Sequence, residues 1–240
     1  MQQIFTTLSL RSGKALSRCN RLLVLLCLLI ATQPLATGKI ERFLFGMFFV
    51  LILAQSAVAL SEFKGHRHIV RALAVLSGLA VVATFAAPEA TRDVMPAMTI
   101  LLAAYTAYTA FLLLKFVMQG DADVRTRLSG AISVYLLAGV AWAMAFLTLH
   151  LLDRDSFTGS SIEHLLQVEQ ETGQPQGVFR FFLYYSFVTL TTLGYGDATP
   201  HTEAARTMAV MEAIGGVFYI AVIVASLIGR EHGVLDEDPP

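Results

Sequence analysis

Charged residues are so sparse in this chain that they divide it into long, mostly apolar stretches. Only 35 of the 240 side chains are Asp, Glu, Lys or Arg (17 basic and 18 acidic), and a helix needs about 17 to 25 mostly apolar residues to cross a bilayer. Five stretches of this length contain no charge: 22–38, 43–61, 72–88, 94–114 and 128–152. A sixth begins near His201, carries Glu212 in its first half and is uncharged from 213 to 229. The sequence therefore predicts an all-α membrane protein with six transmembrane helices.

Lysine and arginine orient these spans, because both favour the cytoplasmic side of short loops. Eleven of the 17 fall on one side of the predicted membrane. They are Arg11, Lys14, Arg18, Arg21, Lys64, Arg67, Arg71, Lys115, Arg125, Arg127 and Arg230. We therefore expect a multi-pass protein of the plasma or inner cell membrane, with both termini in the cytoplasm and the 153–178 connection outside.

The first span has a second interpretation. A basic start followed by the apolar run 22–31 is also typical of a secretory signal peptide. A retained span is favoured because no clean small-x-small cleavage site follows the apolar run. Cleavage within 22–36 would leave five spans and change none of the later orientations.

Charge and motifs exclude several classes of function. The net charge of −1 leaves no excess for nucleic-acid binding. Cys19 and Cys27 form neither a disulfide framework nor a metal-ligand pattern. The sequence contains no phosphate-binding loop and no catalytic His-Glu-x-x-His motif, so we expect neither an enzyme nor a cofactor.

One motif between the last two spans carries the function. It reads Tyr-Tyr-Ser-Phe-Val-Thr-Leu-Thr-Thr-Leu-Gly-Tyr-Gly-Asp over 184–197, and it resembles the pore region of the potassium channel family. The resemblance implies a re-entrant pore helix at 178–191 and a selectivity filter at 192–196. It implies potassium at the carbonyl oxygens of Thr192, Leu193, Gly194 and Tyr195, with Gly196 completing the filter. Because the chain contains a single filter strand, the resemblance also implies a homotetramer in the bilayer.

Glycines make this filter possible. Successive carbonyl groups can point to one axis only if alternate residues take mirror-related conformations, and Gly194 and Gly196 can adopt positive φ without a Cβ penalty. The resemblance assigns filter support to Thr191, to Tyr184 and Tyr185 as bracing aromatic residues, and to Asp197 just above the filter. Val188 lies where some family members carry a glutamate paired with that aspartate, so this chain lacks that pair.

The last span resembles the inner helix of these channels. Gly215 and Gly216 lie near its middle, where they are interpreted either as a hinge or as a site of close helix packing. Glu212 is an ionisable group inside the membrane. We interpret it as a strut behind the pore helix, against Ser186 or Thr189, in preference to an ion contact. His201 is interpreted as structural, with sensing of external pH as the alternative.

The fourth span, 94–114, lacks the arginine series of a voltage sensor, so we expect weak or absent voltage dependence. The predicted function is passive, potassium-selective conduction, and the alternative is a non-conducting sensor or assembly subunit that keeps the pore fold.

The arrangement of spans gives the domain boundaries. We expect a cytoplasmic tail (1–21), a four-helix domain (22–118), a pore domain (128–229) and a second tail (230–240). The pore domain is expected to consist of an outer helix (128–152), a turret (153–177), a pore helix (178–191), a filter (192–196) and an inner helix (201–229).

Overall fold

The computed structural model describes most of the chain as a set of long helices. The described ranges are 2–32, 38–59, 66–86, 88–91, 93–119, 124–172 and 177–235. Parts of six predicted segments lie outside these ranges: residue 1 of the first tail, 33–37 of the first span, 60–61 of the second, residue 87 of the third, 173–176 of the turret and 236–240 of the second tail.

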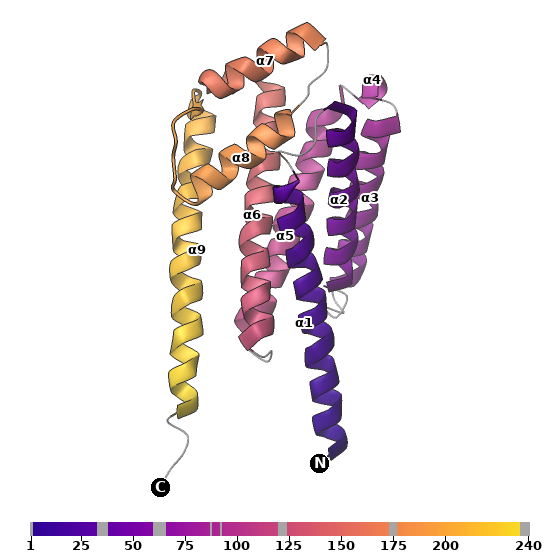
Figure 1. Cartoon of the computed structure of the whole chain (residues 1–240), viewed down its shortest axis with the longest axis vertical. Helices are drawn as coiled ribbons and strands as arrows, with labels where there is room; N and C mark the ends of the chain where they lie inside the picture. The colour runs from indigo at the N-terminus through magenta and orange to yellow at the C-terminus, as the bar shows by residue number, and fades with distance from the viewer. Residues whose placement is uncertain are drawn as a thin grey trace.

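The amino-terminal half forms a bundle of four long helices against a fifth. They are α1 (Gln2–Ala31), α2 (Gly38–Ala59), α3 (Arg67–Ala86), α5 (Met95–Gln119) and α6 (Val124–Leu152), with the short α4 (Pro88–Thr91) before α5. Neighbours along the chain pack side by side, and α1 also packs against α6, which closes the bundle (Figure 1). Helices of this length are expected, since a backbone in lipid must satisfy its hydrogen bonds internally.

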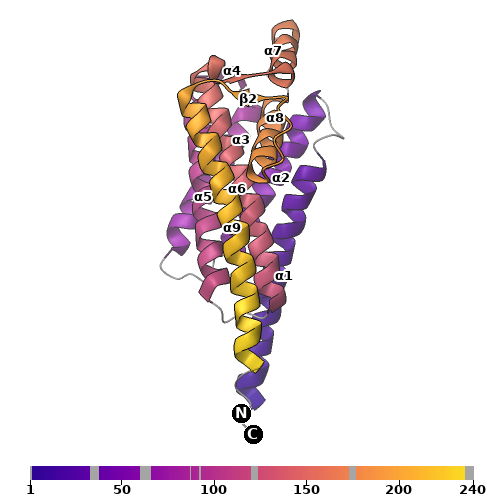
Figure 2. The ribbon, with the colours of Figure 1, turned by 90° about the vertical axis from the view of Figure 1, so that its left-hand side faces the viewer.

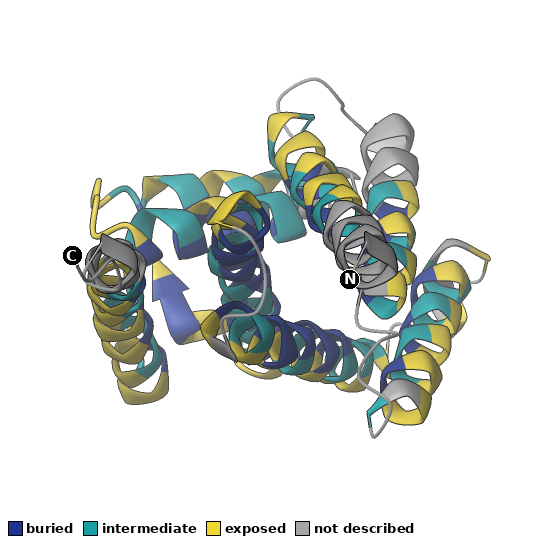
Figure 3. Cartoon of the chain, turned by 90° about the horizontal axis from the view of Figure 1, so that it is seen from below, coloured by how far each residue is buried: buried dark blue, intermediate teal, exposed yellow. Residues whose placement is uncertain are grey.

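The bundle core is apolar. Leu22, Leu26 and Leu29 form a completely buried stripe on α1, and Leu137 and Val140 of α6 are buried in the same cluster. In the view along the bundle, buried residues lie between the helices and exposed residues face outward (Figure 3). This pattern fits helices whose outer faces meet lipid.

The predicted amino-terminal tail is helical. Residues 2–21 belong to the same continuous helix as the first predicted span, α1. Proline is absent before Pro34, and the basic residues of this segment are good helix formers, so nothing stops the helix upstream of Leu22.

Three helices in the described part of the chain are long and apolar enough to cross a membrane. They are Met95–Met118, Val124–Leu152 and Glu203–Ile223. The apolar portions Gly46–Val58, His68–Thr84 and Val178–Leu190 are shorter. The prediction of six spans therefore stays a prediction.

The carboxyl-terminal half surrounds a short inclined helix. After α6 come the 3₁₀ turn η3 (Arg154–Ser156), strand β1 (Phe157–Thr158), α7 (Ser160–Thr172), α8 (Val178–Leu190), strand β2 (Thr199–Pro200) and α9 (Glu203–Leu235). The 13 residues of α8 span about 20 Å at 1.5 Å each. This helix lies obliquely between α6 and α9, and α7 lies beyond it at the end of the molecule away from the two termini (Figure 1).

Element boundaries differ slightly from the expected ones. The outer helix α6 begins four residues before 128, and α9 begins two residues after 201 and continues past 229. The predicted turret holds a helix, α7, of 13 residues. The amino-terminal end of α1 and the carboxyl-terminal end of α9 lie at the same end of the molecule (Figures 1 and 2).

Candidate functional site

The segment after α8 has an alternating backbone. Thr192, Gly194 and Gly196 have φ values of +59°, +57° and +78°, and among the described non-glycine residues Thr192 alone has positive φ. Every second residue of 192–196 is thus left-handed, which turns successive carbonyl groups toward the same side of the strand. Thr192 is β-branched and strained in this conformation, and strain of this kind persists where neighbouring structure holds it.

The end of α8 supplies that support. The amide nitrogen of Thr192 donates to the Thr189 carbonyl at 2.9 Å, and the nitrogens of Leu193 and Gly194 donate to the Val188 carbonyl at 2.9 and 3.3 Å. The alternating segment therefore starts directly from the last turn of α8. This helix end carries about half a negative charge, which favours a cation beside it.

The two predicted bracing tyrosines have different contacts. Tyr184 stacks on Tyr195, with ring centroids 6.4 Å apart and planes 9° apart, and its hydroxyl lies 3.1 Å from both carboxylate oxygens of Asp197. Tyr185 instead packs edge-on against Phe146 and Phe157 in a buried aromatic cluster. Tyr184 therefore braces the segment directly, whereas Tyr185 anchors α8.

Residues that the sequence did not single out complete the support. The Tyr135 hydroxyl on α6 donates to the Leu190 carbonyl at 3.2 Å, and the Ser161 hydroxyl on α7 donates to Asp197 Oδ2 at 2.8 Å. A Cβ at Gly139 of α6 would overlap the Phe187 ring, so this glycine lets α8 approach α6 closely. Gly139 inside an apolar span was the one sequence signal that could have been used.

The alternating segment and α9 are largely uncovered in one chain. Leu193 and Tyr195 are 55% and 66% exposed. Only 17% of the apolar part of α9 is buried, against 44% and 50% for α5 and α6, and Figure 3 shows α9 exposed on its outer sides. Large apolar surfaces of this kind mark contacts with other proteins or with lipid.

Part of the chain around this segment matches a known protein family. Residues 156–230 match a family model described as ion channel. This segment is therefore similar to ion-channel domains. The matched segment contains α7, α8, the alternating segment and most of α9, and the match supports an ion-channel function. The chain matches no curated protein and no solved structure in these comparisons.

Glu212 of α9 is completely buried behind α8. Its Oε1 lies 2.5 Å from the Ser186 hydroxyl oxygen, which also lies 2.8 Å from the Gly139 carbonyl of α6. The carboxyl thus connects α9 to α8 and, through Ser186, to α6. Of the two partners proposed for a strut, Ser186 is the one bonded. Thr189 instead offers its carbonyl to Thr192.

We expect Ser186→Ala to lower the free energy of unfolding by about 1 to 3 kcal/mol per chain, since it removes the link and leaves buried acceptors unpaired. Thermal unfolding of the purified protein measures this. Ser133→Ala is the matched control, because the buried Ser133 hydroxyl donates to Ser129 of its own helix. Equal melting temperatures for the two variants would contradict the linking role.

The two adjacent glycines of α9 have different surroundings. A Cβ at Gly216 would overlap the carbonyl oxygen of Leu190 at the end of α8, whereas a Cβ at Gly215 would meet nothing within 4 Å. Gly216 is therefore a site of close packing between α8 and α9. The contact places α9 directly behind the start of the alternating segment.

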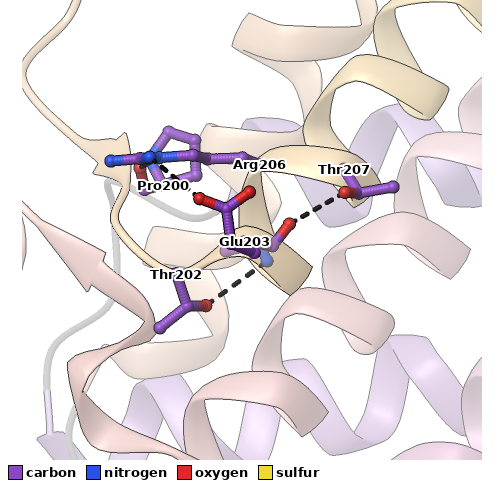
Figure 4. A network of polar contacts seen from close by, with 6 residues as sticks. Pro200, Thr202, Glu203, Arg206 and Thr207 are labelled. Atoms are coloured by element: carbon purple, nitrogen blue, oxygen red, sulfur yellow. Dashed lines mark hydrogen bonds and ion pairs between the residues drawn. The ribbon is translucent and has the colours of Figure 1, made fainter.

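Hydrogen bonds fix the start of α9 (Figure 4). Thr202 Oγ1 accepts from the Ala205 amide at 3.4 Å, and the Thr207 hydroxyl donates to the Glu203 carbonyl at 2.8 Å. Arg206 lies 3.3 Å from Glu203 and 3.5 Å from the Pro200 carbonyl, but exposed pairs of this kind add little stability. The exposed His201 is held through its backbone, which donates to Ser156 at 2.8 Å.

Proposed function

We propose that the protein is a homotetrameric, potassium-selective channel. The observation that carries this proposal is the alternation of positive φ at Thr192, Gly194 and Gly196 within the Thr-Thr-Leu-Gly-Tyr-Gly-Asp motif. A potassium ion gives up its water only when oxygens replace it, and a row of carbonyl groups facing one axis supplies them. The carbonyl oxygens of Thr192, Leu193, Gly194 and Tyr195 are the proposed ligands, with potassium as cargo.

One strand cannot surround an ion, so four copies supply the remaining ligands around a shared axis. The uncovered face of α9 and the exposed filter residues support this assembly, since irregular backbone at membrane depth is viable only where protein buries it or it lines water. In the tetramer four α8 carboxyl ends point toward the axis. Their combined partial charges favour a dehydrated cation there.

The remaining helices form the proposed periphery. We propose six spans per chain (α1, α2, α3, α5, α6 and α9), with both termini in the cytoplasm and α7 outside. The amino-terminal end of α1 and the carboxyl-terminal end of α9 lie at the same end of the molecule, which supports an even number of crossings.

We expect conductance to depend weakly on voltage, because the part of α5 between Met95 and Leu114 carries no charge that the field could move. Each elementary charge supplies only about 2.3 kcal/mol per 100 mV. Current-voltage recordings from the purified channel in planar bilayers check this. A steep activation curve with measurable gating currents would contradict it.

Flux of potassium against sodium into liposomes tests the proposed function. Purified, full-length tetramers are expected to give flux that favours potassium strongly and is blocked by barium. Light scattering of the detergent-solubilised protein checks that four chains assemble. Well-folded tetramers without flux across pH, voltage and membrane tension would instead indicate a non-conducting subunit.

A further inference from the structure

The turret and the segment after the filter form one unit. Strand β1 pairs antiparallel with β2, so that Phe157 lies opposite Pro200 and Thr158 opposite Thr199. The His201 amide donates to the Ser156 carbonyl at 2.8 Å, and the Ser161 amide donates to the Asp197 carbonyl at 3.3 Å. Backbone hydrogen bonds thus tie 156–161 to 197–201 along their whole length.

Gly159 shows how closely these two segments approach. Its φ is +127°, and a Cβ there would overlap the carbonyl oxygen of Asp197. Any other residue would force the turret away from the end of the filter. The first turn of α7 therefore lies directly beside Asp197.

Two side chains from different elements hold the Asp197 carboxylate. Tyr184 reaches it from α8 at 3.1 Å, and Ser161 reaches it from α7 at 2.8 Å. Val188, also on α8, has no polar side-chain atom and cannot contribute. The turret thus supplies the second donor, which the pore helix itself does not.

We propose that Ser161 is a positioning residue for the selectivity filter: through Asp197 it fixes the orientation of the Tyr195–Gly196 end. This inference rests on the proposed channel function. Gly196 precedes Asp197 and, lacking a Cβ, can change its backbone conformation easily. A firmly held Asp197 prevents that rotation and keeps the outer carbonyl groups facing the ion.

Loss of the hydroxyl should therefore weaken potassium binding rather than assembly. Ser161 is partly exposed, so alanine fits without disturbing a core. Hydrogen bonds to charged groups are worth enough to change a population about tenfold. In Ser161→Ala we expect the outer filter to be ordered less often, with weaker potassium binding and lower selectivity.

Two measurements on purified, full-length tetramers test this. The first is the potassium concentration that gives half of the maximal thermal stabilisation, titrated with potassium chloride against sodium chloride. The second is the potassium-to-sodium permeability ratio in planar bilayers. Ser161→Ala is expected to raise this half-maximal potassium concentration about tenfold and to lower the permeability ratio by a similar factor. Ser161→Thr should restore both to within about twofold, since it keeps the hydroxyl.

Ser160→Ala is the matched control, because Ser160 is the exposed neighbour at the start of α7. If Ser161→Ala does not assemble, Ser161→Cys, with its weak donor, is expected to give an intermediate shift. Two results overturn the inference: wild-type values for the variant that assembles, or an equal loss of melting temperature in both salts with an unchanged permeability ratio. If the wild type conducts potassium selectively and Ser161→Ala gives either of these results, only the role of Ser161 is contradicted. If the wild type shows no selective flux, the proposed function is contradicted, and the role of Ser161 with it.

Discussion

Gly194→Ala is expected to abolish potassium flux while leaving a folded protein. A Cβ at Gly194 would meet nothing within 4 Å of its own chain, so the effect arises from the backbone and not from a clash. At φ +57° an L-residue other than glycine costs about 1 to 2 kcal/mol. The neighbouring Thr192 already bears such strain at +59°.

In the proposed tetramer, four chains multiply this cost. Even at the lower limit, one substitution in each of four copies costs about 4 kcal/mol, which lowers the population of the conducting filter roughly a thousandfold. Liposome flux measures the loss. Gly78→Ala is the matched control, since Gly78 lies in α3 with nothing within 4 Å of its Cβ position and without a positive φ. Wild-type flux through Gly194→Ala would contradict the proposed role of the alternating backbone.

Gly216→Ala is expected to lower the stability of the protein. The added methyl group would overlap the Leu190 carbonyl oxygen, which is backbone and cannot rotate away. Overpacking of this kind costs about 1 to 3 kcal/mol per chain. Because α8 leads directly into the filter at this point, the same displacement should also reduce selective flux.

Gly215→Ala gives a matched comparison at the adjacent position. Its Cβ enters open space, and alanine is favoured over glycine in a helix by about 0.5 to 1 kcal/mol. Thermal melting of the purified tetramers should therefore fall for Gly216→Ala and stay equal or rise for Gly215→Ala. If both variants melt like the wild type and only the fraction of open channels changes, then a hinge, and not packing, explains the two glycines.

Much of the local structure follows from composition. Stretches without charge must be helical in lipid, because the backbone there has no water to bond. The helices α2, α3, α5 and α6 contain most of the predicted stretches 43–61, 72–88, 94–114 and 128–152. The sequence also predicted positive φ at Gly194 and Gly196, since glycine alone accepts that conformation at no cost. The positive φ at Thr192 was not singled out, because threonine carries no such signal.

The role of Glu212 could be predicted from the sequence only in part. A carboxyl group inside an apolar helix predicts a polar partner by itself. The sequence predicted Ser186 or Thr189 as this partner. The rotation of α8 relative to α9 brings Ser186 into contact with Glu212. The further connection to Gly139 needed the position of α6 as well.

The sequence by itself determined the helices, the filter motif and the glycines that permit its backbone, since these depend on local composition and on the solvent. Only the tertiary structure decided what holds the alternating segment 192–196 in place. Tyr135 and Leu190 are 55 residues apart in the chain, and Ser161 and Asp197 are 36 apart. Contacts of this range depend on how helices rotate and pack against one another, and no spacing along the chain encodes that rotation.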